Sequence, residues 1–258
     1  MTDESIGGFG QLKAELKGIY EMFGKKASVG IEDLGFRYGL GTFETLIVKS
    51  GTVQFRDWHE QNLREAAQAL GIKLPDLSAL TMTPRGTGIW RWFLTPSALH
   101  ASFTPGLPAL PESYRVAVSP LRLSSLAWES RYKTLSYLLH YQAWLERGSW
   151  DEMLLLNENS EIASAAMANV FWFKDGVLFT PELACGCRSG VIRRWVLENF
   201  SGEVRQVRSP LAALQSADEI FLTNSRIGVM PLTEFDGEPL VACPLTTKLR
   251  DQLTASKH

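Results

Sequence analysis

The sequence predicts a mixed α/β (α+β) fold of two domains. A chain of 258 residues is long enough for two domains that each bury a core. Short β-rich runs and amphipathic helical stretches occur in both halves, which is typical of such folds. The pattern restarts after Pro120, so we expect an N-terminal domain over 1–118 and a C-terminal domain over 123–258. Clefts between domains favour small ligands, and we expect one there.

The N-terminal half contains two predicted helices, a hairpin and two strands. The hairpin turns at Ser50-Gly51, a pair that suits a tight turn. Apolar residues at steps of three and four define both helices. The helices cover 9–23 and 58–70, the hairpin covers 43–55, and the strands cover 89–94 and 114–119.

The C-terminal half alternates helices and strands in the same way. A hairpin turns at Asp175-Gly176, another pair that favours a tight turn. The predicted helices are 134–147, 190–200 and 246–253, the strands are 152–157 and 219–223, and the hairpin is 170–179.

Composition excludes several classes of partner. The formal net charge is −2 and no block of Lys or Arg occurs, which argues against nucleic acid and anionic membranes. The apolar runs are too short to span a bilayer, and the N-terminus does not resemble a signal peptide, so we expect a cytoplasmic protein. Cys185, Cys187 and Cys243 form no metal-binding pattern, and we interpret the first two as structural thiols beside a turn.

Two ionisable residues stand out for chemistry. Lys133 begins a predicted helix that is otherwise poor in charge. Such a lysine is usually solvated, but a semi-buried amine with a lowered pKa can act as a Schiff-base nucleophile. Glu161 precedes a run of small residues and needs either exposure or a cationic partner. Taken alone, each residue leaves both interpretations open.

A series of short motifs occurs in a specific order along most of the chain. Together they resemble the class IV aminotransferase family, the fold-type IV enzymes that use pyridoxal phosphate (PLP). The resemblance begins near Ile31 and continues to the C-terminus. Its blocks are Glu32–Gly39 with Gly41–Thr45, His59 with Leu63, Lys133–Tyr137, Glu161, Ala168–Trp172, Asp175-Gly176, Thr180-Pro181, Gly190–Arg193, Thr223–Ser225 and Pro231.

The resemblance assigns expected roles to individual residues. Lys133 would carry PLP as a Schiff base and move protons at the substrate, while Glu161 would pair with the pyridine nitrogen. A carboxylate there keeps the ring protonated, so that it accepts electrons. Backbone N–H groups at a helix start would bind the phosphate. The expected cofactor-binding residues are Lys133, Glu161, Tyr137 near the ring hydroxyl, Gly190, Val191, Ile192, Thr223 and Asn224.

Three positions depart from the family pattern. Asn62 replaces an arginine that grips the phosphate, Ile192 replaces a threonine, and Leu40 replaces an aspartate. The first two changes remove donors from the phosphate site. Arg64 is two positions past Asn62, so on a helix it should point elsewhere. Cations that could compensate are Arg56, Arg193 and Arg194.

The resemblance leaves three functions open. The leading hypothesis is aminodeoxychorismate lyase, which releases pyruvate from 4-amino-4-deoxychorismate and yields 4-aminobenzoate for folate synthesis. The second is an aminotransferase for a branched-chain or D-amino acid. In that enzyme Arg91, which stands between two tryptophans, would bind a carboxylate of the substrate; the alternative interpretation is a core strand with Arg91 exposed. The third is a cofactor-poor relative without catalytic activity. The family further implies a homodimer acting on a small amino substrate.

Overall fold

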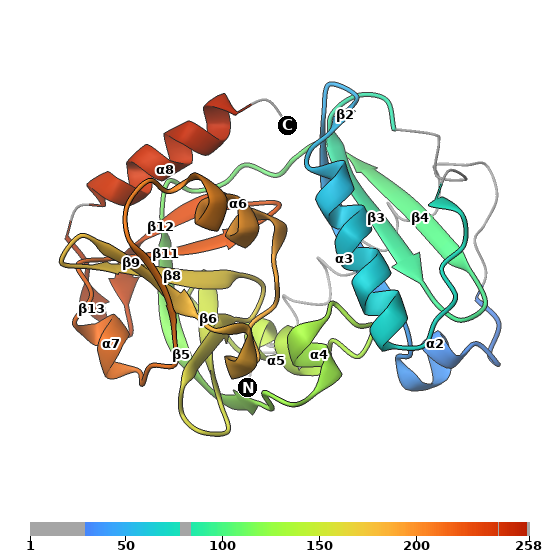
Figure 1. The fold of residues 1–258 in the computed structure, drawn as a ribbon, viewed down its shortest axis with the longest axis horizontal. Coiled ribbons are helices and arrows are strands. Elements are labelled where there is room, and N and C mark those ends of the chain that lie inside the picture. Colours follow the sequence, from blue (N-terminus) through green and yellow to red (C-terminus); the bar gives the residue numbers. More distant parts are fainter. Residues whose placement is uncertain (1–28, 78–83, 242, 257–258) are drawn as a thin grey trace, which may run out of the picture. The chain divides into compact units, whose positions relative to one another are not determined.

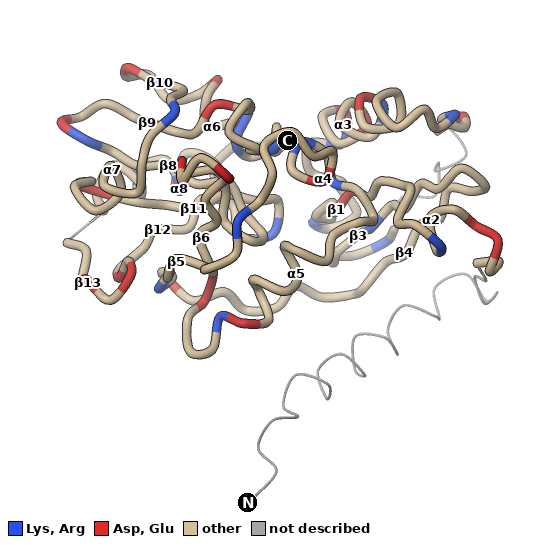
Figure 2. The backbone as a smooth tube through the Cα atoms, turned by 90° about the horizontal axis from the view of Figure 1, so that it is seen from below, with Lys and Arg blue, Asp and Glu red and all other residues tan. Residues whose placement is uncertain are grey.

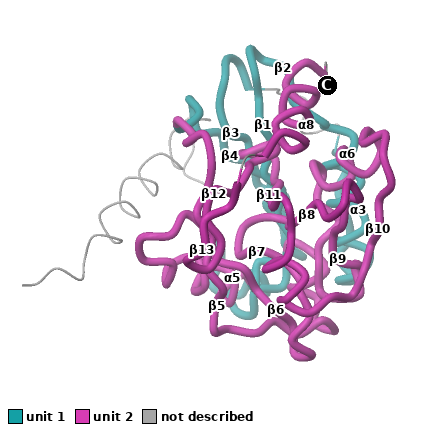
Figure 3. The backbone as a smooth tube through the Cα atoms, turned by 90° about the vertical axis from the view of Figure 1, so that its left-hand side faces the viewer, with its two compact units in different colours: residues 1–108, 134–136 teal, residues 109–133, 137–258 magenta. Residues whose placement is uncertain are grey.

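The chain forms two compact units in the computed structural model, which describes residues 29–77, 84–241 and 243–256. Figure 3 colours the units separately: unit 1 extends to Pro108 and includes Thr134–Ser136, and unit 2 contains Ala109–Lys133 and the chain from Tyr137 onward. The division therefore lies before residue 109 and not near 118–123, because the strand predicted at 114–119 pairs within unit 2. The helix predicted over 9–23 lies outside the described residues.

Unit 1 contains a four-stranded antiparallel sheet in the order β2-β1-β3-β4. Helix α3 packs against β1 (Figure 1). The hairpin predicted at Ser50-Gly51 is confirmed, with both residues at positive φ (49° and 82°), and so is the helix predicted over 58–70. The elements are α2 (Leu34–Tyr38), β1 (Thr42–Lys49), β2 (Thr52–Val53), α3 (Arg56–Ala69), β3 (Gly88–Leu94) and β4 (Leu99–Pro105).

The core of unit 1 lies between this sheet and α3. Side chains alternate between the two faces of a strand, and on β3 this alternation buries Trp90, Trp92 and Leu94. The two tryptophan rings meet edge to face, with centroids 5.0 Å apart. They pack with Leu46 of β1 and Leu63 of α3, both fully buried.

Unit 2 is built on a mixed sheet of nine strands among its described residues. The order is β10-β9-β8-β11-β12-β5-β6-β7, and β13 pairs with β12. The terminal strand β7 also contacts β8 and β9, so the sheet curls back on itself as in a barrel. The strands are β5 (Tyr114–Leu123), β6 (Glu152–Asn157), β7 (Ile162–Ala165), β8 (Asn169–Lys174), β9 (Val177–Pro181), β10 (Val204–Val207), β11 (Glu219–Asn224), β12 (Gly228–Phe235) and β13 (Glu238–Pro239).

Helices cover parts of this sheet. Helix α8 packs on β12 and β11, α6 packs on β11, and α5 packs on β5 and β6. The buried carboxylate of Glu219 accepts hydrogen bonds from the backbone N–H and hydroxyl of Thr246, which places a negative charge at the start of α8. The helices are α4 (Trp128–Arg131), α5 (Leu138–Leu145), α6 (Val191–Asn199), α7 (Ala212–Gln215) and α8 (Pro244–Ala255), and Leu183–Cys185 forms the short 3₁₀ helix η2.

Two predicted boundaries in this region were wrong. The helix predicted over 134–147 begins only at Leu138, because Leu135 N–H donates to the carbonyl of Gly41 and Thr134 bridges to Thr42. Tertiary pairing thus holds this segment extended. Strand β5 continues past Pro120 to Leu123, with its register shifting between Val118 and Arg122. A bulge of this kind lets a strand accommodate proline.

Charged residues are spread along the described chain without a long run of one sign. Acidic and basic residues are interspersed along each unit (Figure 2). This agrees with the net charge of −2 and with the absence of a basic block in the sequence. Within the described residues, no helix combines the length and the apolar character that crossing a bilayer requires.

One carboxyl group in the core of unit 2 is unusual. Glu152 begins β6 and is 3% exposed. Its two oxygens accept hydrogen bonds from the backbone N–H groups of Met153 (2.9 Å) and Met167 (3.2 Å). Burial nevertheless raises the pKa of Glu152 to about 7, because removing the charged form from water outweighs these two bonds.

We expect Glu152 to make the stability of the protein depend on pH. Its ordinary pKa is 4.5, so the folded protein binds this proton more tightly than the unfolded chain. The contribution is fully present below pH 4.5 and is lost as pH rises through about 7, amounting to about 3 kcal/mol. Glu152→Gln, which resembles the protonated form, should flatten the fall in unfolding free energy between pH 5 and 8, measured in urea. The exposed control Glu238→Gln should not, and an unchanged pH profile in Glu152→Gln would refute the assignment.

Candidate active site

A buried hydroxyl on β11 marks the candidate site. Thr223 is 0% exposed, and its Oγ1 has no hydrogen-bond partner among the described residues. A buried hydroxyl left without a partner is costly. Thr223 lies directly opposite Asn169 of β8 in the sheet register, so these two side chains belong to one region. A ligand oxygen bound beside it would give this hydroxyl a hydrogen-bond partner.

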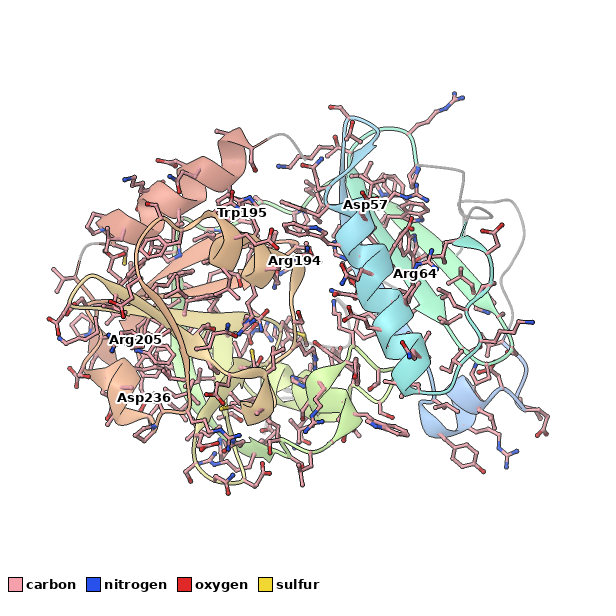
Figure 4. The ribbon with its side chains drawn as sticks, in the orientation of Figure 1. Asp57, Arg64, Arg194, Trp195, Arg205 and Asp236 are labelled. Atoms are coloured by element: carbon pink, nitrogen blue, oxygen red, sulfur yellow. The ribbon has the colours of Figure 1, made fainter. Side chains whose placement is uncertain are left out.

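The N-terminus of α6 lies beside the same asparagine. Gly190 is the N-cap residue and no side chain caps the helix, so the N–H groups of its first turn remain available. A Cβ atom at position 190 would collide with Asn169 Oδ1, so only glycine fits there. Figure 4 labels Arg194 and Trp195 on this helix, which packs against β11.

These groups fit the phosphate of PLP. The Thr223 hydroxyl and the uncapped first turn of α6 supply a hydrogen bond, N–H groups and the positive end of a helix dipole. The side chains of Val191 and Ile192 are buried (5% and 3% exposed), so these residues can offer only their backbone to an anion. The contribution expected from Gly190, Val191, Ile192 and Thr223 is therefore geometrically reasonable.

Tyr137 belongs to a second cluster of side chains in unit 2. Its hydroxyl accepts a hydrogen bond from Arg188 Nη1 at 2.7 Å, and its ring stacks with His140 at 4.9 Å between centroids. His140 Nδ1 lies 3.0 Å from the carbonyl of Ala166, to which it donates as the neutral tautomer. Burial, and after it the charge of Arg188, holds the pKa of His140 well below its usual value, so the imidazole is neutral.

Lys133 lies four residues before Tyr137. It is partly buried and sits in extended chain between α4 and α5, not at the start of a helix as we expected. Asn224, the neighbour of Thr223, uses its side chain within unit 2: Nδ2 donates to the carbonyl of Met167, and Oδ1 accepts the N–H groups of Arg226 and Ile227. Its side chain thus stabilises the turn between β11 and β12.

Glu161 is not brought to this region. It lies at the turn between β6 and β7, where Asn157 Nδ2 donates to its carboxylate at 2.8 Å and its backbone bridges to Pro210. Ala165, at the opposite end of β7, is roughly 13 Å farther along the strand. The chain reaches Asn169 from that opposite end. The expected role of Glu161 at the pyridine nitrogen therefore stays a prediction.

The three arginines considered as substitutes for the cation missing at Asn62 have other partners. Arg193 is buried and donates to the carbonyl of Pro181 and to Gln206 Oε1, which ties α6 to β9 and β10. Arg194 pairs with Glu198 within α6. In unit 1, Arg56 pairs with Glu60 of the same helix.

Two further arginines named in the sequence analysis, Arg64 and Arg91, lie in unit 1. Arg64, labelled on α3 in Figure 4, has a side chain that is 59% exposed, as expected from its helical spacing. Trp90 and Trp92 belong to the core of unit 1, whereas Arg91 points to the other face of β3 and donates to Thr104 at 3.2 Å. The alternation of the strand thus separates Arg91 from both tryptophans.

The sequence did not single out Arg188 or the contacts of Asn169. Arg188 follows Cys185-Gly186-Cys187, and both thiols are buried. Burial raises the pKa of Cys185 to about 11, which favours the protonated thiol and agrees with a structural role. An arginine beside buried cysteines and two positions before a helix-capping glycine is a signal, but arginine is so often exposed that the signal is weak.

Comparisons with known proteins agree on one family. A family model described as amino-transferase class IV matches residues 84–235. Aminodeoxychorismate lyase of Bacillus subtilis is 29% identical over 243 residues, covering 82% of this chain and 83% of the relative. Branched-chain-amino-acid aminotransferase of Pseudomonas aeruginosa is 24% identical over 255 residues, covering 83% of this chain and 82% of the relative.

Solved structures show the same fold. The crystal structure of 4-amino-4-deoxychorismate lyase from Pseudomonas aeruginosa matches with a TM-score of 0.78 and 28% identity. The match covers 89% of this chain and 95% of that protein. The predicted fold-type IV architecture is thereby confirmed.

We expect the hydroxyl of Thr223 to lower the stability of the ligand-free protein and to strengthen the binding of PLP. Thr223→Val keeps the shape of the side chain and removes the unpartnered hydroxyl. The protein without a ligand should become more stable by about 1–2 kcal/mol, because the penalty of an unsatisfied buried group disappears. Its affinity for PLP should fall by about tenfold or more. Urea denaturation and absorbance titration measure the two effects, and a loss of stability without a loss of affinity would contradict the assignment.

Proposed function

The chain belongs to the class IV aminotransferase family, and on this premise we propose that it is a PLP-dependent lyase converting 4-amino-4-deoxychorismate into 4-aminobenzoate and pyruvate. The observation that carries the cofactor assignment is the buried, unpartnered hydroxyl of Thr223 beside the uncapped start of α6. The likeness to a lyase over four fifths of both chains supports the choice of reaction.

The proposed chemistry divides among the residues of unit 2. Thr223 and the first turn of α6 bind the phosphate, and the Tyr137 hydroxyl orients the ring. Bound PLP supplies an electron sink for charge that develops on the substrate. Lys133 provides the amine that anchors the cofactor and then takes the proton from the amine-bearing carbon of the substrate. Loss of that proton and cleavage of the ether bond to the enolpyruvyl group make the substrate ring aromatic. The leaving group takes the electron pair of the broken C–O bond as an enolate, which gains a proton on carbon to become pyruvate.

The alternative is an aminotransferase for a branched-chain or D-amino acid. A binding site for the phosphate and an amine at position 133 would serve either reaction, and the aminotransferase relative covers as much of this chain as the lyase does. A cofactor-poor relative without activity is the third possibility, since Asn62 and Ile192 remove two phosphate contacts. We further propose a cytoplasmic homodimer that contributes to folate synthesis, as the family resemblance implies.

The decisive experiment measures products of the purified protein supplied with PLP. With aminodeoxychorismate we expect 4-aminobenzoate and pyruvate in equal amounts, and little keto acid from a panel of branched-chain and D-amino acids. Lys133→Ala should reduce turnover by roughly 10²–10⁴-fold or more and abolish covalent attachment of PLP. Lys248→Ala, an exposed lysine of α8, serves as the control. Full activity of Lys133→Ala would refute the proposal, and transamination without 4-aminobenzoate would favour the aminotransferase.

Glu161 offers a test that separates its expected role from its position. A carboxylate paired with the pyridine nitrogen stabilises developing charge, and its loss costs on the order of a hundredfold in rate. Because its carboxylate is bound by Asn157 at the turn between β6 and β7, we expect Glu161→Gln to change kcat and PLP affinity by less than about threefold. A hundredfold loss of kcat with normal PLP binding would instead place Glu161 at the ring.

A further inference from the structure

Arg188 connects the two clusters of the candidate site. Its carbonyl accepts hydrogen bonds from Asn169 Nδ2 and from the N–H of Gly190, both at 2.9 Å. Its backbone is therefore fixed at the start of α6, where we place the phosphate. Its side chain extends to Tyr137, so a single residue fixes the position of one cluster relative to the other within unit 2.

The guanidinium is held against the Tyr137 ring in a defined orientation. Nη1 donates to the tyrosine oxygen at 2.7 Å, and the guanidinium carbon lies 4.6 Å from the ring centroid. Nη2 donates to the carbonyl of Glu129 at 3.1 Å. The planar, rigid fork of an arginine suits two acceptors at once, whereas a lysine has only a point-like ammonium.

The charge of Arg188 is not neutralised by these partners. Its two side-chain acceptors, a phenol and a carbonyl, are both uncharged, and Nε is buried with no partner among the described residues. His140, which stacks on the same tyrosine, is neutral. A partly buried cation without a counter-ion favours the binding of an anion nearby.

The hydrogen bond from Arg188 also determines what the tyrosine can do. A guanidinium only donates, so it occupies an acceptor site on the Tyr137 oxygen. The hydroxyl hydrogen of Tyr137 must then point elsewhere, and a neighbouring cation makes the hydroxyl a stronger donor. Tyr137 is thereby prepared to donate to an anionic oxygen.

PLP carries two anionic groups, the phosphate and the oxygen on its ring. Thr223 and the start of α6 account for the phosphate. We propose that Arg188 is a positioning residue that holds the Tyr137 hydroxyl as a donor to the ring oxygen of PLP and supplies positive charge at that end of the cofactor. The inference rests on the proposed function, because it requires PLP at this site.

Binding of two probes tests the proposal without relying on activity. Pyridoxamine 5′-phosphate has both the ring oxygen and the phosphate and forms no covalent bond with a lysine, whereas inorganic phosphate represents the phosphate alone. Affinities would be measured by calorimetry and by thermal shift for Arg188→Met, Arg188→Lys, Tyr137→Phe and the double variant Arg188→Met/Tyr137→Phe. Arg205→Met removes an exposed arginine of β10 and is the matched control. Thr223→Val should weaken both probes.

The expected result is a selective and coupled loss. Arg188→Met should weaken pyridoxamine 5′-phosphate about tenfold and inorganic phosphate less than about twofold. Arg188→Lys should lie between wild type and Arg188→Met, because it retains charge and loses the fork. The affinity of the double variant for pyridoxamine 5′-phosphate should lie within about twofold of that of Tyr137→Phe alone, because the arginine acts through the tyrosine. If Arg188→Met does not fold, the same comparison is made with Arg188→Lys, Tyr137→Phe and the variant that combines them, and it tests the coupling of the two residues.

Several results would overturn the inference. An equal loss for inorganic phosphate would place Arg188 at the phosphate, and additive losses in the double variant would show that it acts independently of Tyr137. Reduced thermal stability with unchanged affinities would make its role structural only. Failure of the wild-type protein to bind PLP would overturn the proposed function as well, whereas normal binding and turnover with unaffected Arg188 variants would overturn this inference alone.

Discussion

The side chain of Asn169 is the interaction on which the candidate site depends. Its Nδ2 donates to the carbonyl of Arg188 and approaches Cys187 Sγ at 3.1 Å, and its Oδ1 faces Gly190 so closely that no Cβ would fit there. The first residue of β8 therefore determines where α6 begins. Because Asn169 also pairs with Thr223 across the sheet, the same amide aligns the helix N-terminus with the buried hydroxyl. Regular secondary structure alone would not align them.

Local sequence signals predicted the turns and helices whose conformation depends mainly on residues close by in the sequence. The turns at Ser50-Gly51 and Asp175-Gly176 require positive φ at both positions, and both pairs adopt it. Helix α3 follows from apolar spacing, because one face covers the sheet of unit 1. The segment after Lys133 has a helical pattern but is held extended by Gly41 and Thr42, about 90 residues earlier, and no local pattern encodes such a partner.

The site was predictable to a similar extent. The family motifs predicted Lys133, Tyr137, Gly190 and Thr223 as cofactor residues, and all four lie in unit 2. The structure shows two features that agree with this prediction: the close approach of Asn169 to Gly190, and the buried Thr223 hydroxyl without a partner among the described residues. Glu161 was assigned its role by the family resemblance, but the run of small residues after it contains β7, and that strand separates Glu161 from Asn169. Arg188 escaped notice because its function lies in contacts with residues far away in sequence.

The short excursion of the chain at Thr134–Ser136 has a consequence for how the protein is made. These residues belong to unit 1, although the stretch before them, Ala109–Lys133, belongs to unit 2. A ribosome releases the chain from its N-terminus, so the sheet of unit 1 leaves the exit tunnel long before Thr134 can bridge to Thr42. The last contacts of unit 1 therefore form only while unit 2 is already emerging. The backbone that follows Lys133 is therefore the last part of unit 1 to reach its final conformation during synthesis.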